Sequence, residues 1–207
     1  GNFLWSGDSL FLTDLHQAKI IKSLSSSQRL WNLAHLFHSL RSVWGEEEQL
    51  QFLDCYFEGR FARFQEREIL YHKIYPVMNR LQKRQWGSRT KRCLKQSSEF
   101  TVEREKGICY FRRRDFPLDR LKRVIERHKS LVREKPFSLI KYSPEVIVSI
   151  LVDEGERICL KQFCYPSFWG RMKEHFRRSK GLKSWVAANG IRARGLPSVK
   201  SFGLVER

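Results

Sequence analysis

The chain has 207 residues, of which 41% are apolar, and this share is enough to bury a sizeable core in one large or two small domains. It carries 40 Lys and Arg against 22 Asp and Glu, a formal net charge of +18, which favours nucleic acid, an anionic membrane surface or phosphate-bearing substrates as partners. No apolar run approaches the roughly 20 residues of a membrane-spanning helix, which excludes that class.

The cysteines give no sign of a metal site or a disulfide framework. They are odd in number and form no CxxC pair: Cys55, Cys93, Cys109, Cys159 and Cys164. Three of them, Cys55, Cys109 and Cys159, lie within apolar runs. We therefore expect reduced, mostly buried thiols in a cytoplasmic protein.

The first 85 residues predict a β-hairpin followed by a helical bundle. Apolar runs on both sides of Ser6-Gly7-Asp8-Ser9 indicate a hairpin over residues 3–13. Apolar residues then recur at three- and four-residue steps, which predicts helices over 28–44, from 46 to near 59, and over 65–85. The basic, polar stretch 86–98 fits a boundary between two halves of the chain.

The second half alternates strands and helices. Strands are expected at 100–102 and 108–111, then a basic amphipathic helix over 117–132, three antiparallel strands at 137–140, 146–152 and 157–163, a helix over 176–193 and a last strand at 201–205. The fold class expected is α+β.

Lys161 lies in the third of the three consecutive strands. Alternation places it on one face with Cys159 and Phe163, and places Leu160 and Gln162 on the other. A lysine beside an aromatic ring and a thiol calls for an anionic partner, although an edge-strand lysine that reaches solvent fits the spacing as well.

The order strand, strand, lysine strand, helix, strand is that of a protein-kinase-like N-lobe, where such a lysine binds the α- and β-phosphates of ATP. The stretch "FRRSKGLKSWVAANGIRARGLPSVKSFGLVER" resembles the αC-to-hinge segment of the bacterial lipopolysaccharide kinase family. The resemblance implies that Lys161 binds ATP and that Glu206 begins the hinge that receives the adenine. It departs from the kinase pattern in lacking a Gly-rich loop, and Ser184 stands where a glutamate should pair with the lysine.

The first residues carry the same resemblance. "TDLHQAKI" is similar to the Asp-Leu-His pattern that this family has in place of Asp-Phe-Gly, with Gln17 where Arg is usual. In kinases a catalytic-loop Asn, a hairpin and then an Asp hold the Mg²⁺ that bridges the ATP phosphates. The resemblance therefore implies that Asn2 and Asp14 are the metal ligands. "QRLWNLAHLF" and "EEEQLQFLDCYF" resemble helices of the family's C-lobe.

The order of these parts is reversed for a single kinase domain, because the metal ligands precede the lysine. We expect a fragment with three parts: a mainly helical C-lobe remainder at 1–90, a basic connecting region at 91–136, and an antiparallel-sheet N-lobe with an αC-type helix at 137–207. A circular permutation and a chance resemblance in one half of the chain are the alternatives. The catalytic Asp is expected upstream of Gly1, so the fragment alone should be inactive.

The resemblance implies an ATP- and Mg²⁺-dependent kinase that phosphorylates a sugar hydroxyl of the lipopolysaccharide inner core. It implies a cytoplasmic protein, peripheral at the anionic inner face of the cytoplasmic membrane. Two alternatives stay open: a pseudokinase scaffold, and a basic nucleic-acid-binding protein that uses residues 83–133. Nucleic acid is the less favoured partner.

Overall fold

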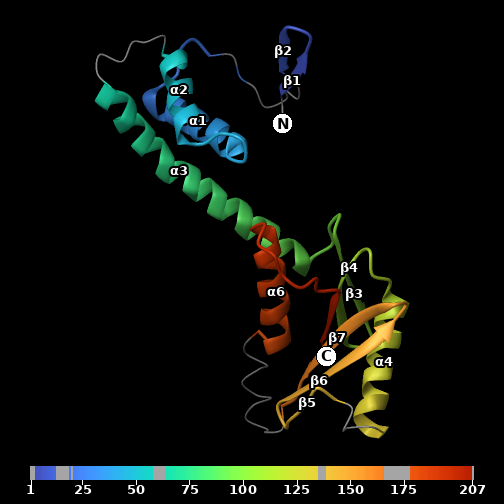
Figure 1. Ribbon diagram of the computed structural model, residues 1–207. Coiled ribbons are helices and arrows are strands. Elements are labelled where there is room, and N and C mark those ends of the chain that lie inside the picture. The colour runs from blue at the N-terminus through green and yellow to red at the C-terminus, as the bar shows by residue number, and fades with distance from the viewer. Residues whose placement is uncertain are drawn as a thin grey trace. The chain divides into compact units, whose positions relative to one another are not determined.

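The computed structural model describes residues 3–12, 19, 21–57, 64–134, 139–165 and 178–206. Over these ranges the chain is a mixture of helices and small antiparallel sheets, which confirms the α+β class (Figure 1). It divides into two compact units, residues 1–85 and 86–207, and each is described by itself.

The first unit begins with the predicted hairpin. Strands β1 (Phe3–Ser6) and β2 (Ser9–Leu12) pair antiparallel, with Ser6 opposite Ser9. The two-residue turn starts at Gly7, whose φ of 59° lies in the left-handed region that glycine adopts without a steric penalty.

Three helices follow: α1 (Ser26–Leu40), α2 (Glu46–Tyr56) and α3 (Phe64–Lys91). A capping box starts α1, because Ser25 Oγ accepts from the Gln28 N–H and Gln28 Oε1 accepts from the Ser25 N–H at 2.9 Å. The helix ends at Leu40 rather than at the predicted Trp44. The Trp44 N–H donates to the Leu40 carbonyl at 2.9 Å, which turns the indole back toward the Phe37 ring, 6.3 Å away between centroids.

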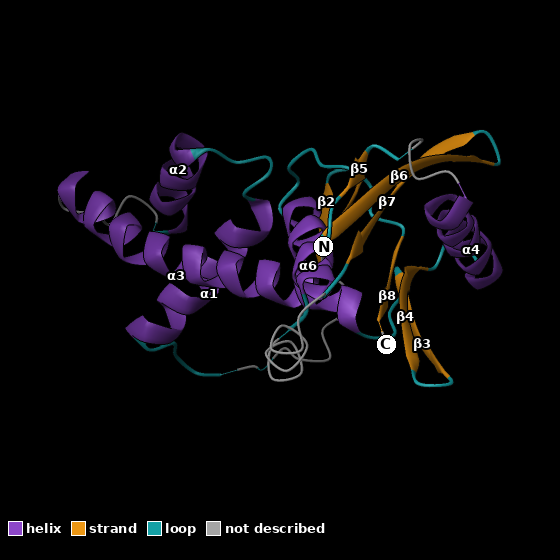
Figure 2. Ribbon diagram, turned by 90° about the horizontal axis from the view of Figure 1, so that it is seen from below, coloured by secondary structure: helices purple, strands orange, loops and turns teal. Residues whose placement is uncertain are grey.

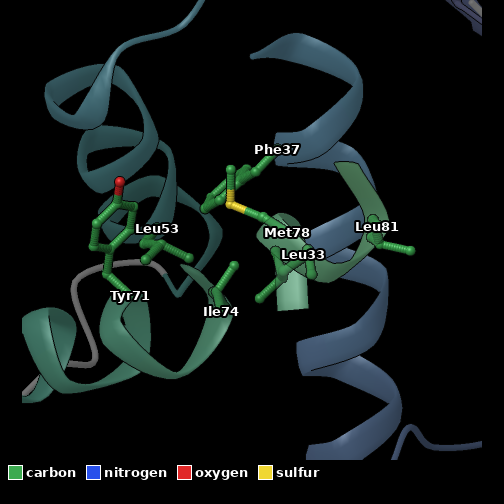
Figure 3. Close-up of a cluster of buried hydrophobic side chains, with 8 residues drawn as sticks. Leu33, Phe37, Leu53, Tyr71, Ile74, Met78 and Leu81 are labelled. Carbon is green, nitrogen blue, oxygen red and sulfur yellow. The ribbon is translucent and has the colours of Figure 1, made fainter. Parts of the chain in front are cut away.

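The apolar faces of these helices meet in one buried cluster (Figure 3). Its members come from α1, α2 and the first part of α3: Leu33, Ala34, Phe37, Leu53, Tyr71, Ile74, Met78 and Leu81. The three- and four-residue spacing on α1 and α3 accounts for this shared face.

The second unit contains two three-stranded antiparallel sheets (Figure 2). One has the order β3–β4–β8, formed by Phe100–Glu105, Ile108–Arg113 and Gly203–Glu206. The other has the order β5–β6–β7, formed by Lys141–Tyr142, Val146–Asp153 and Glu156–Phe163. Helices α4 (Leu118–Glu134) and α6 (Lys180–Ala193) and the short 3₁₀ helix η2 (Arg92–Leu94) complete the unit.

Both long hairpins of this unit close with the same turn. Lys106 and Gly107 have φ values of 48° and 79°, and Glu154 and Gly155 have 50° and 78°. Two consecutive left-handed residues define a type I′ turn, whose twist matches that of antiparallel strands. The sequences Glu-Lys-Gly and Asp-Glu-Gly supply these two turns.

Further boundaries differ from the sequence prediction. The first strand of the lysine sheet is Lys141–Tyr142 rather than 137–140, and residues 135–138 lie outside the described ranges. Helix α3 continues past residue 85 to Lys91, because the stretch after Trp86 contains no proline and packs on α6. The last strand pairs with β4, so part of the expected connecting region belongs to the same sheet as the end of the chain.

Two apolar clusters explain that pairing. The α4 cluster takes Tyr110 from β4 and Val205 from β8, which lie opposite each other, and adds Leu151, Ile158 and Leu160 from the other sheet. The α6 cluster takes the alternate residues of the same strands, with members Cys93, Phe100, Trp185, Leu94, Phe111, Leu182, Val186 and Leu204. Because β4 and β8 are apolar on both faces, they fit between α4 and α6.

Candidate functional site

The sheet β5–β6–β7 has one covered face and one open face. Along β6, burial alternates at every residue, with Ile147, Ser149, Leu151 and Asp153 buried. These side chains face α4, and the period of two sends their neighbours to the opposite side. The alternation predicted for the lysine strand is therefore confirmed, because Ile158 is buried and Lys161 is exposed.

A buried histidine fixes α4 to the covered face. His128 lies 2.7 Å through Nδ1 from Ser149 Oγ and 3.0 Å through Nε2 from Gln162 Oε1. The Gln162 oxygen can only accept, so Nε2–H donates to it, and Nδ1 forms the second hydrogen bond with the serine hydroxyl. Both strands are thereby held in register under the helix.

A second polar contact fixes the end of this sheet. Asp153 is only 5% exposed, and its carboxylate accepts from Arg120 at 2.8 Å, with Arg123 and Arg127 at 3.4 and 3.3 Å. The hydrogen bond from Arg120, followed by that from Arg123, holds the pKa of Asp153 below its usual value. The arginines recur at three and four residues along α4, a spacing that could have revealed this contact from the sequence.

The open face is formed by the outward side chains of β5–β7: Lys141, Val146, Val148, Ile150, Val152, Arg157, Cys159, Lys161 and Phe163. It contains three cations and no acidic residue. Val148 pairs with Lys141 on one side and with Lys161 on the other, so the two lysines lie in one cross-strand row. Two strand spacings separate their backbones by about 10 Å. Sequence analysis missed Lys141, because only the register of the strands reveals its position.

Lys161 itself is exposed, and its ammonium lies 4.9 Å from the centroid of the Phe163 ring. Among the described residues, no carboxylate lies within ion-pair distance of it. Its neighbour Cys159 is exposed as well, as is Cys55, so the expectation of buried thiols is wrong for these two. Cys93 is the buried thiol, and burial raises its pKa to about 11.

Glu206 has a different environment from Lys161. Its carboxylate accepts a hydrogen bond from Ser179 Oγ, which also accepts from the Leu182 N–H at 2.9 Å and so caps α6. A Cβ at Gly181 would lie 2.9 Å from Leu204 Cδ1, so the start of α6 closely approaches β8. No described contact joins Lys161 and Glu206.

The predicted metal ligands Asn2 and Asp14 lie outside the described residues. Ser184 is exposed on α6. Within the described ranges, no group of three or more His, Cys, Asp or Glu side chains could hold a metal ion.

Comparison with protein-family models, with curated proteins and with solved structures finds no match for this chain. Among the described helices, none combines the length and apolarity needed to cross a bilayer.

Proposed function

We propose that this chain belongs to an ATP-dependent phosphotransferase of the lipopolysaccharide kinase type, which phosphorylates a sugar hydroxyl of the inner core. The observation that carries the proposal is the open face of the lysine sheet. There, Lys161 and Lys141 flank Val148 in one row, and none of the described residues on that face is acidic.

A row of two lysines suits a chain of phosphates. An ammonium is a compact charge that binds phosphate oxygens by charge-assisted hydrogen bonds, and two side chains on flexible stems can reach successive phosphates from backbones about 10 Å apart. Ile150, 38% exposed on the same face, offers an aliphatic surface next to this row. The face thus combines groups for the charged and the apolar parts of a nucleotide.

The arrangement around this face also supports the proposal. Leu160 of the lysine strand and Val205 of the last strand pack in the α4 cluster, so the strand with the lysine and the strand of the expected hinge share a core. Helix α6 connects the two in sequence, as an αC-type helix would. The resemblance assigns Mg²⁺ to Asn2 and Asp14, and a bound Mg²⁺ would neutralise phosphate charge.

Equilibrium binding of Mg²⁺·ATP to the chain, measured by titration calorimetry, tests the proposal. Lys161→Ala should weaken binding about tenfold or more, since a hydrogen bond to a charged group is worth roughly 1.5–3 kcal/mol. Lys141→Ala should weaken it as well, because Lys141 lies in the same cross-strand row. Lys129→Ala, which removes an exposed lysine paired with Glu126 on α4, is the control and should bind as the unaltered chain does.

Three outcomes would contradict the proposal. If Lys161→Ala binds ATP with unchanged affinity, the open face is not the ATP-binding site. Absence of ATP binding, together with salt-dependent binding of oligonucleotides, identifies a nucleic-acid-binding protein instead. Binding of ATP that does not depend on Mg²⁺ favours a pseudokinase scaffold.

A further inference from the structure

The end of α6 and the segment after it expose aliphatic side chains to solvent. Val199 is 86% exposed, Leu196 55% and Ile191 40%. We call residues 191–200 the α6 tip. Single exposed aliphatic residues are common on protein surfaces, but three within ten positions of the sequence present apolar area that water solvates poorly.

The backbone holds two of these side chains in place. The Leu196 N–H donates to the Ile191 carbonyl at 3.3 Å, and the Gly195 N–H donates to the Arg192 carbonyl at 2.9 Å. This pair of bonds is a Schellman motif, and Gly195 supplies its left-handed residue with φ of 75°. This turn brings the backbone of Leu196 back beside that of Ile191, and the Leu196 side chain is exposed there.

The same tip is cationic. Arg192 and Arg194 are exposed, and the Arg194 guanidinium lies 5.6 Å from the centroid of the Trp86 ring near the end of α3. Thr90 packs against the position of Gly190, so exposed Arg89 beside it belongs to the same region of the second unit. The sequence from 180 to 202 contains no acidic residue. The described ion pair of the tip joins Lys200 to Asp115 at 2.9 Å.

We propose that the α6 tip docks onto an anionic lipid bilayer, with Leu196 and Val199 entering the headgroup region and Arg192, Arg194 and Arg89 contacting lipid phosphates. The exposed aliphatic side chains favour an anionic lipid bilayer over nucleic acid as the partner. They gain free energy in the boundary between headgroups and acyl chains, whereas nucleic acid is bound by cations and stacking aromatic rings. This surface does not depend on the proposed kinase activity.

Flotation of the full chain with vesicles tests the proposal. Binding is expected with vesicles that contain phosphatidylglycerol and not with vesicles of phosphatidylcholine alone. The double variant Leu196→Ser and Val199→Ser should weaken binding about tenfold, because it removes apolar insertion and leaves the charge unchanged. Its control is Ile69→Ser, which alters an aliphatic residue of α3 that is 52% exposed.

A second pair of variants tests the charge. Arg192→Glu should weaken binding to the anionic vesicles about 25-fold, since each unit of charge near such a surface contributes about fivefold and the change amounts to two units. Arg104→Glu makes the same change at an exposed residue of β3. This residue lies at the end of the β3–β4–β8 sheet away from Gly203, where the tip leads into β8, so the change should have little effect. Circular dichroism confirms that each variant is folded.

The proposal is overturned if the unaltered chain does not float with anionic vesicles, or if the serine double variant binds them as tightly. It is also overturned if a single-stranded oligonucleotide displaces the vesicles and the serine variant binds that oligonucleotide normally, because the surface is then a nucleic-acid site. A loss of ATP binding in Lys161→Ala would leave these results unaffected.

Discussion

Ser149 is 1% exposed, and its hydroxyl meets a buried imidazole. Ser149→Ala leaves His128 Nδ1 without a partner in the interior, which should lower the free energy of unfolding by about 1–3 kcal/mol in urea titrations. Ser130→Ala, which removes an exposed hydroxyl from α4, is the control and should change it by less than about 0.5 kcal/mol. Equal effects of the two changes would contradict a structural role for the buried pair.

The ionisation of Asp153 should make the stability of the second unit depend on pH. Its pKa is lowered in the folded chain, chiefly by Arg120, so its contribution to stability is complete above its unfolded pKa of about 4 and is lost as the pH falls through the lower folded value. Asp153→Asn should therefore be less stable than the unaltered chain at neutral pH. The difference should shrink below about pH 4 in urea titrations. A difference that stays constant down to strongly acidic pH would show that the ion pairs contribute nothing.

The buried and exposed cysteine thiols should differ in their rates of alkylation. Burial raises the pKa of Cys93 to about 11, and its thiol donates to the Thr90 carbonyl at 3.0 Å, whereas Cys55 and Cys159 are exposed. Iodoacetamide at neutral pH should modify the two exposed thiols first and Cys93 only after unfolding, as peptide mass spectrometry would show. Equal labelling rates would contradict the burial of Cys93.

Two glycines show how elements respond differently to the same change. Gly87 lies inside α3 with nothing within 4 Å of a new Cβ, so Gly87→Ala should stabilise the helix by about 0.5–1 kcal/mol. Gly155 has a φ of 78° in its turn, and Gly155→Ala should destabilise by about 1–2 kcal/mol. Thermal unfolding of both variants measures the opposite signs. The same sign for both would contradict one of the two backbone assignments.

The sequence predicted the elements that have a strong local pattern. Alternation along β7, the three- and four-residue spacing of α1 and α3, and the turn at Ser6-Gly7-Asp8-Ser9 are local properties, and all of them agree with the structure. The pairing of β8 with β4 was not predictable in this way, because it depends on two helices that supply apolar surface to both faces of these strands. The exposure of Cys159 was missed for a related reason: an apolar strand can leave one face uncovered.

The candidate site was only partly accessible from the sequence. Alternation identified the face of Lys161, but Lys141 joins it through strand register, which no local pattern encodes. Asn2 and Asp14 remain predictions, since their positions lie outside the described residues.

At the scale of the whole chain, the division into two units predicts separate stabilities. Leu53 is fully buried in the first unit, and Leu53→Ala should destabilise that unit by about 2–5 kcal/mol. Hydrogen exchange should accelerate in α1 and α2 and stay unchanged in β6 and β7. Faster exchange in both places would show that the units unfold together.

The pairing of β8 with β4 also sets an order of events during synthesis. The strand at residues 203–206 joins residues 109–112, and Trp185 bonds to Cys93 across 92 positions of sequence. A ribosome releases the first unit and the β3–β4 hairpin long before their last partner emerges, and contacts between such distant residues form slowly. Until then the edge of β4, with Tyr110 and Phe111, is an unprotected strand. The newly made chain is therefore expected to need chaperone protection over this interval.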